Sequence, residues 1–185
     1  MKFKLTLLLL LLPLLAFAKH AEFLGIPING NITQFTTKLN NKGFTVDWNM
    51  SKVSGDTRWF NGSYYDRKCQ LIAYYTPGTK LVYRVKVLYN LYSQSSAEKL
   101  MVDLKDALSR KYDIEFEEGS HNMYKAWSGP IYEEVSSSYN GSRNHELLGW
   151  VNLYLSYDYG DYTLHVDFYD CENYDKYQEI INNNI

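Results

Sequence analysis

Apolar and polar residues alternate on both sides of the pair Tyr159-Gly160. Before it, the odd-numbered positions from Val151 to Tyr157 are apolar or aromatic, and after it the even-numbered positions from Tyr162 to Phe168 are. A period of two is typical of strands with one buried face. Pairing Asp158 with Asp161 across the turn places every apolar residue of one strand opposite an apolar residue of the other. The pattern predicts an antiparallel hairpin in this register.

The opposite face of the same hairpin carries polar and aromatic residues in three cross-strand pairs. These candidate ligand-binding pairs are Trp150 with Tyr169, Asn152 with Asp167, and Tyr154 with His165. Rings that flank a row of donors and acceptors suit a shallow platform for a sugar or a peptide. Two other interpretations stay open: ordinary cross-strand pairs on a solvent face, or residues buried beneath a covering helix.

Three segments have helical periodicity. Asn31 is a candidate N-cap with Gln34 at the capping-box spacing, and Gly43 would end that helix. A longer helix is predicted to start at Ser95, with Glu98 completing a capping box and an apolar stripe along one side. A short helix near the carboxyl terminus has an apolar stripe of Tyr174, Tyr177 and Ile181.

The remaining periodic segments are short strands joined by turns. The segments 69–75 and 81–89 flank a turn at 76–79, and Asn61-Gly62 inside 58–65 predicts either a bulge or a tight turn. By contrast, 128–146 has no period, and we interpret it as a long exposed excursion, either a floppy hairpin or a mobile flap.

Helix and strands therefore follow one another twice, with turns too short for crossover helices. This order predicts an α+β fold: antiparallel sheet, in one piece or more, with two main helices packed on one face and a short C-terminal helix. The order also suggests a loose tandem duplication with halves 19–93 and 94–185, although the two halves share negligible residue identity. We expect 19–185 to form a single mature domain, since its length suffices for one core.

The first eighteen residues have the pattern of a secretory signal. Lys2 and Lys4 precede a leucine-rich run, and Ala16-Phe17-Ala18 offers a small-x-small cleavage site. The apolar run is short for a membrane span, which takes about 20 residues. The sequence therefore predicts cleavage after Ala18, a periplasmic or secreted location, and no membrane span in the mature chain.

Composition adds two constraints. The formal net charge is −2 and becomes more negative once Lys2 and Lys4 are removed, which argues against nucleic acid or an anionic membrane as partner. The chain has 18 tyrosines, whose rings suit both half-buried strand positions and contact surfaces.

The two cysteines, Cys69 and Cys171, lie in a chain expected to be exported. An even count in an oxidising compartment suggests a disulfide. However, Cys69 falls on the inner parity of its strand, whereas Cys171 falls on the outer parity of the last strand. A disulfide and two free thiols are therefore both open alternatives.

No catalytic, metal or cofactor motif stands out. His165 and Asp167 lie two apart on one strand and share a face, with Tyr154 and Ser156 as the nearby hydroxyls, a weak basis for a hydrolase. The acidic residues Asp158, Asp161, Asp170 and Glu172 do not form a calcium loop, and the four histidines are scattered. We predict no metal site, no cofactor and no catalytic residues.

Two stretches resemble a known class of proteins. The run Phe23 to Gly30 (FLGIPING), followed by Lys42-Gly43-Phe44, and later Val82 to Val85 with Lys111-Tyr112, are similar to small secreted proteins of gut Bacteroidetes. That resemblance implies an exported bacterial protein and brings no catalytic signature. In element order the chain is also similar to the tandem helix-plus-sheet modules of β-lactamase-inhibitor proteins and of small outer-membrane assembly lipoproteins, a likeness of shape alone.

These observations favour an exported, non-enzymatic binding or interaction module whose partner is an unknown protein or glycan. One alternative is an envelope-assembly or structural protein whose edge strands pair with another chain. The second alternative is a small hydrolase that uses His165 and Asp167.

Overall fold

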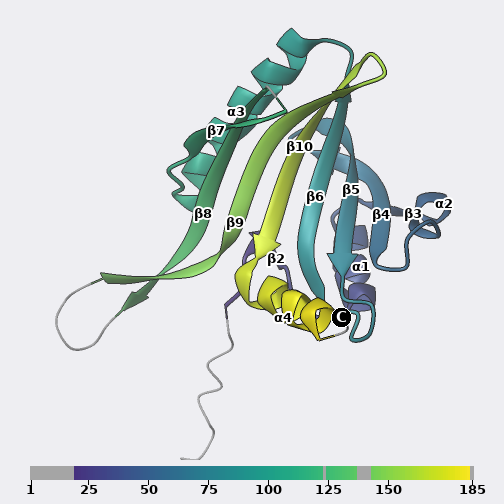
Figure 1. Ribbon diagram of the computed structural model, residues 1–185, viewed down its shortest axis with the longest axis vertical. Helices are drawn as coiled ribbons and strands as arrows, with labels where there is room; N and C mark the ends of the chain where they lie inside the picture. The colour runs from purple at the N-terminus through teal and green to yellow at the C-terminus, as the bar shows by residue number, and fades with distance from the viewer. Residues whose placement is uncertain (1–18, 123, 137–142, 184–185) are drawn as a thin grey trace, which may run out of the picture.

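The structure, a computed structural model, describes residues 19–122, 124–136 and 143–183. Its centre is one sheet of eight antiparallel strands (Figure 1). In spatial order the strands are β3 (Thr45–Asp47), β4 (Thr57–Tyr64), β5 (Arg67–Tyr75), β6 (Val82–Leu91), β10 (Asp161–Asp170), β9 (Arg143–Asp158), β8 (Tyr124–Ser136) and β7 (Glu117–His121).

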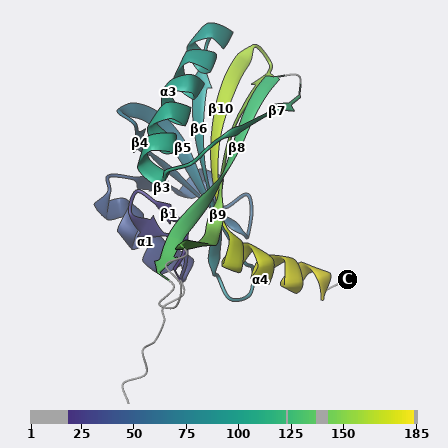
Figure 2. The ribbon, with the colours of Figure 1, turned by 90° about the vertical axis from the view of Figure 1, so that its left-hand side faces the viewer.

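Two helices, α1 (Ile32–Asn41) and α3 (Gln94–Tyr112), lie on one face of this sheet (Figure 2). The C-terminal helix, α4 (Cys171–Asn182), lies on the opposite side, across one end of the strands (Figures 1 and 2). Three small elements complete the fold: β1 (Glu22–Phe23), β2 (Ile26–Pro27) and α2 (Trp48–Ser51). The predicted α+β class, with two main helices on one face and a short C-terminal helix, is confirmed.

The hydrophobic core lies between the sheet and the two helices on that face. Inward-facing residues of β9 and β10, from Val151 to Leu155 and from Leu164 to Phe168, are at most 1% exposed. They meet Phe35 and Leu39 of α1 and the stripe Ala97 to Leu108 of α3 in one cluster. The predicted hairpin register is confirmed, because Asp158 pairs with Asp161, Leu155 with Leu164 and Val151 with Phe168.

The two parts of the chain meet at the centre of the sheet. Helix α1 precedes the strands β3 to β6, helix α3 precedes β7 to β10, and the two four-strand groups join where β6 pairs with β10. Each group is an antiparallel meander, so neighbouring strands follow one another in the chain. The evolutionary duplication itself stays a prediction.

The helix signals were correct in one case and displaced in the other. Asn31 caps α1 by accepting a hydrogen bond from the Thr33 backbone at 2.8 Å. Helix α3 starts two residues earlier than predicted, because Ser93 rather than Ser95 is its N-cap, with Ser96 N–H as donor. Either serine has the right chemistry, and the strand end at Leu91 favours the earlier one.

Asn61-Gly62 is neither a tight turn nor a bulge. Both residues continue β4 in regular pairing with β5, and the chain turns at Tyr65 and Asp66, which both have positive φ. A glycine is required at 62 for a packing reason: a Cβ there would lie 2.3 Å from the buried ring of Phe44.

The excursion expected over 128–146 is for the most part regular structure. Strand β8 continues to Ser136, and β9 begins at Arg143, so the two form long paired arms with one irregularity between Ile131 and Tyr132. Residues 137–142 lie outside the described residues. Ile131 joins the core, whereas Tyr132, His145, Glu146 and Leu147 are all exposed, so burial imposes no apolar period on this part of the arms.

We expect Gly149→Ala to destabilise the protein by about 2–3 kcal/mol, as overpacking does. A Cβ at Gly149 would lie 2.0 Å from the backbone oxygen of Tyr169 and 2.7 Å from Ala21, so the strands must separate. Gly119→Ala in β7 is the matched control, because a Cβ there meets nothing within 4 Å. Urea unfolding measures both variants, and equal stability of the two would contradict the close packing at Gly149.

Candidate functional site

The six predicted site residues lie together on the sheet face opposite α1 and α3, which we call the outer face. The register pairs Trp150 with Tyr169, Asn152 with Asp167 and Tyr154 with His165, as the alternation predicts. Helix α4 crosses one end of this face, where Tyr83 stacks on Tyr177 at 4.2 Å between ring centroids. The rest of the face has no helix over it among the described elements (Figures 1 and 2).

A cavity of about 470 Å³ opens on the outer face between β7 and the pair β9–β10. Four of the six predicted residues line it, namely Asn152, Tyr154, Asp167 and Tyr169. Ser128 of β8 and the segment 117–121 of β7 form the other walls. Trp150 and His165 lie on the same face but do not line the cavity, and Trp150 is 38% exposed.

Three charged residues, which we call the charged triad, lie together on the outer face beside the cavity: Arg84, Lys86 and Asp167. Of these, Asp167 lines the cavity. Arg84 donates to both carboxylate oxygens of Asp167, from Nε at 2.8 Å and from Nη2 at 2.5 Å. The Lys86 ammonium lies 3.4 Å from one of these oxygens. The three side chains are 21%, 13% and 1% exposed respectively, so the triad is largely shielded from water.

Aromatic rings provide that shielding. The Arg84 guanidinium lies over the rings of Tyr74 and Tyr169, at 4.5 and 4.7 Å from their centroids. Tyr169 also donates its hydroxyl to Asp167 at 3.2 Å. Burial opposes the charge of Arg84, but its bonds to Asp167 outweigh this and raise the guanidinium pKa above its ordinary value. The Arg84 guanidinium therefore stays charged.

Two hydrogen-bonding groups face the cavity with donors to spare. Ser128 donates to the Asn152 side-chain oxygen at 2.6 Å, which fixes the orientation of that amide. The amide nitrogen of Asn152 has no protein acceptor in the described part of the chain. The Tyr154 hydroxyl accepts from Lys86 at 2.9 Å, and its own proton likewise has no described acceptor.

His165 is held as a neutral imidazole beside this site. Its ring stacks on Tyr154 at 4.4 Å with an interplanar angle of 6°, and its Nε2 lies 2.8 Å from Ser156 Oγ. Burial, reinforced by the charge of Lys86, lowers the pKa of His165 from 6.5 to about 4. The other ring nitrogen, Nδ1, is buried without a partner in the described structure.

The sequence analysis missed Arg84 and Lys86 as site residues. Both alternate with core residues along β6, so their outward direction was readable from the sequence. Their proximity to Asp167 could not be predicted from the sequence, because it depends on the pairing of β6 with β10. That pairing brings Lys86 opposite Asp167 and Arg84 opposite Tyr169.

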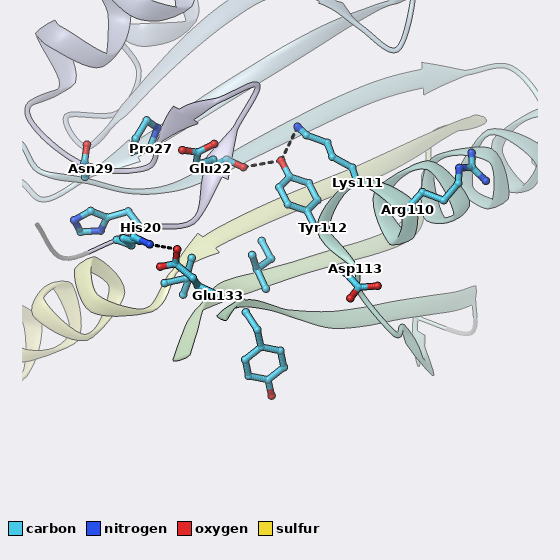
Figure 3. Close-up of a pocket in the computed structure, with 13 residues that line it drawn as sticks. His20, Glu22, Pro27, Asn29, Arg110, Lys111, Tyr112, Asp113 and Glu133 are labelled. Carbon is cyan, nitrogen blue, oxygen red and sulfur yellow. Dashed lines mark hydrogen bonds and ion pairs between the residues drawn. The ribbon is translucent and has the colours of Figure 1, made fainter. Parts of the chain in front are cut away.

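A larger cavity, of about 780 Å³, lies between the lead-in segment, the end of α3 and β8 (Figure 3). Several of its polar groups already bond to one another. Lys111 donates to the Tyr112 hydroxyl at 2.9 Å, which donates to the Glu22 backbone oxygen at 2.8 Å, and Lys19 pairs with Glu133 (Figure 3). We therefore give the outer-face cavity precedence.

Cys69 and Cys171 are both free thiols in the structure. Cys69 is buried on the inner face, and burial raises the pKa of its thiol to about 12. Cys171 opens α4 and is half-buried, with its thiol pKa also raised by burial. Neither thiol is therefore activated as a nucleophile.

Within the described residues, no three His, Cys, Asp or Glu side chains gather so that they could hold a metal ion. The same residues include no helix that is both long and apolar enough to cross a membrane. Comparisons with protein-family models, with curated proteins and with solved structures found no significant match to this chain.

We expect Asp167→Asn to destabilise the protein by roughly 3–5 kcal/mol, because it leaves two cations buried without their counter-ion. Asp103→Asn is the control, since Asp103 forms an exposed pair with Lys99 whose loss costs about 0.5 kcal/mol or less. Urea unfolding at pH 7 measures both. Similar losses in the two variants would contradict the burial of the charged triad.

His165 makes the protein sensitive to mild acid. The unfolded chain takes up a proton near pH 6.5, whereas the folded protein does so only near pH 4. Stabilisation by the neutral imidazole is therefore complete above about pH 6.5 and is lost as the pH falls toward 4. Between pH 7 and pH 4, His165→Gln should lose less unfolding free energy than the unmodified protein, by on the order of 2 kcal/mol after allowing for solvent screening.

Urea unfolding across this pH range, with the exposed His145→Gln as control, tests the assignment. A pH dependence that is unchanged in His165→Gln, or altered equally in both variants, would contradict it.

Proposed function

We propose that this chain is an exported, non-enzymatic binding module whose ligand, a saccharide, occupies the outer-face cavity. The observation that carries the proposal is the cavity itself, since its walls include Asn152, Tyr154, Asp167 and Tyr169. Polar groups that converge between aromatic rings are the usual lining of a small-ligand site.

The size of the cavity supports a saccharide over a protein partner. At about 470 Å³ it lies within the common range of small-molecule sites. A stable protein interface needs about 800 Å² from each partner, and this concave site offers a small area instead. Amide, hydroxyl and carboxylate groups in one cavity also match the alternating hydroxyls of a sugar ring.

Export is supported by the basic, apolar and small-x-small pattern that ends at Ala18. The proposed location is therefore periplasmic or extracellular. Membership among the small secreted proteins of gut Bacteroidetes is part of the same proposal, and it depends on the FLGIPING run and on Lys42-Gly43-Phe44.

A small hydrolase is the second candidate, because Ser156 Oγ lies 2.8 Å from His165 Nε2. A general base works best with a pKa near the working pH and with a third group that orients its ring. His165 has a pKa of about 4, and its Nδ1 has no described partner, while Asp167 is engaged by Arg84. This geometry favours binding over hydrolysis.

An envelope-assembly role is the third candidate and depends on the edge of β8. Strand β7 pairs only with residues 124–128, so 129–136 have no described strand on that side. An open edge can accept a strand from another chain. The acidic Glu133 at this edge is already paired with Lys19, which makes the outer-face cavity the better supported site.

A glycan array tests the proposed function. We expect the purified protein to capture a restricted set of saccharides, and Asn152→Ala to weaken capture at least tenfold, because a buried amide contact contributes about 1.4 kcal/mol or more. Asn90→Ala is the control, since Asn90 is an exposed residue of β6 that lies outside this cavity. Capture that is unchanged in Asn152→Ala, or an array without any bound glycan, would contradict the proposal.

A further inference from the structure

The charged triad contains one more positive charge than negative charge. Asp167 supplies a single carboxylate, and the Arg84 guanidinium already binds both of its oxygens. The Lys86 ammonium is therefore a second cation on the same carboxylate, at 3.4 Å, although its side chain is 13% exposed. A buried charge without its own counter-ion is costly, so proteins keep one where something else compensates it.

No other carboxylate of the described chain pairs with Lys86. Its remaining hydrogen bond goes to the neutral Tyr154 hydroxyl at 2.9 Å. The positive charge of Lys86 also opposes protonation of His165, which lowers the pKa of that ring together with burial. The excess positive charge of Lys86 therefore influences the protonation of the neighbouring His165.

Tyr154 connects Lys86 to the cavity by a hydrogen bond. The Tyr154 hydroxyl accepts a hydrogen bond from Lys86, so its own proton is free to be donated to a ligand. Tyr154 also lines the cavity. The free amide protons of Asn152, two residues away on β9, belong to the same wall. The Asp167 carboxylate lines the same cavity, but Arg84 already binds both of its oxygens. The donors of this wall therefore lie beside the excess charge of Lys86 and are complementary to a negatively charged acceptor.

The opposite wall has a different character. Glu117 and Glu118 of β7 are exposed, and Glu118 pairs with Lys125 at 3.1 Å. Exposed carboxylates are screened by water and interact weakly with a ligand charge several ångströms away. They are suited to accept hydrogen bonds from hydroxyl groups, so the two walls fit the two ends of one acidic sugar.

We propose that the ligand of the outer-face cavity carries an oxyanion, the carboxylate of an acidic saccharide, which accepts hydrogen bonds from Tyr154 and Asn152 beside Lys86. The inference rests on the proposed function and specifies its ligand class. The ligand carboxylate supplies the negative charge that Asp167 alone does not provide. Lys86 is thus a binding residue whose charge destabilises the protein when no ligand is bound.

This cost leads to a test in two parts, with Lys86→Met as the variant. Methionine keeps the length of the side chain and removes the charge. In thermal unfolding without ligand, Lys86→Met should melt at the same temperature as the unmodified protein or higher, because the excess cation is gone. Lys99→Met, at an exposed lysine of α3, is the control and should leave both melting and binding unchanged.

In calorimetric titrations at low ionic strength, D-glucuronate should bind at least tenfold more tightly than D-glucose. Lys86→Met should remove most of this preference, and added salt should weaken glucuronate binding more than glucose binding. Tighter binding of glucose 6-phosphate than of glucuronate would support the oxyanion and identify phosphate as its source.

The results that would contradict the proposal distinguish the acidic ligand from the saccharide site itself. Equal binding of glucose and glucuronate, or a Lys86→Met variant that melts at clearly lower temperature, overturns the oxyanion inference and leaves the saccharide site in place. Failure of all three sugars to bind overturns the inference as well. If Asn152→Ala also fails to alter glycan capture on the array, the proposed function falls with it.

Discussion

Asp167 lies at the centre of the sheet, where β10 pairs with β6 on one side and with β9 on the other. Its carboxylate is 1% exposed and is held by Arg84, Lys86 and Tyr169. Since β6 closes the first group of four strands and β10 closes the second, these bonds cross the junction between the two halves of the chain. An ion pair at this position therefore depends on the correct pairing of β6 with β10.

At this junction, the inner face of the sheet is apolar and the outer face is charged. On the inner face, Val87 lies opposite Val166 and Val85 opposite Phe168, and these apolar pairs join the core beneath α1 and α3. On the outer face, the neighbouring positions of the same strands carry charge. Hydrophobic burial on one face can offset the desolvation of the charges on the other, because both belong to one continuous set of backbone hydrogen bonds.

Much of the local structure could be predicted from the sequence. The β9–β10 hairpin has a strict period of two around a short turn, so register and direction follow from local information, and with them the six outer-face residues. The N-cap at Asn31 is local in the same sense. The partnership of Arg84 with Asp167 spans 83 positions and has no local signal, so the charged triad was not predictable.

The prediction for the segment 128–146 was wrong for a different reason. A strand is recognised by alternation when one of its faces is buried, whereas Tyr132, His145, Glu146 and Leu147 of the arms of β8 and β9 are all exposed. Their backbone pairing, however, is as regular as elsewhere apart from the shift at Ile131 and Tyr132. Backbone hydrogen bonds therefore extend the hairpin beyond the part that hydrophobic burial stabilises, and the types of residue in this extension do not indicate a strand.

Aromatic rings explain how a largely buried charged cluster can exist on a face without a covering helix. Tyr74 and Tyr169 enclose the guanidinium of Arg84, and Tyr154 lies between Lys86 and His165. Each ring excludes water with its apolar body while its hydroxyl or its π face interacts with a neighbouring charge. A helix over this face would bury the cluster equally well, but it would also close the cavity. Tyrosine provides the shielding and leaves Asn152 and Tyr154 lining an open cavity, so the tyrosines of this face allow buried charges and an open cavity to occur side by side.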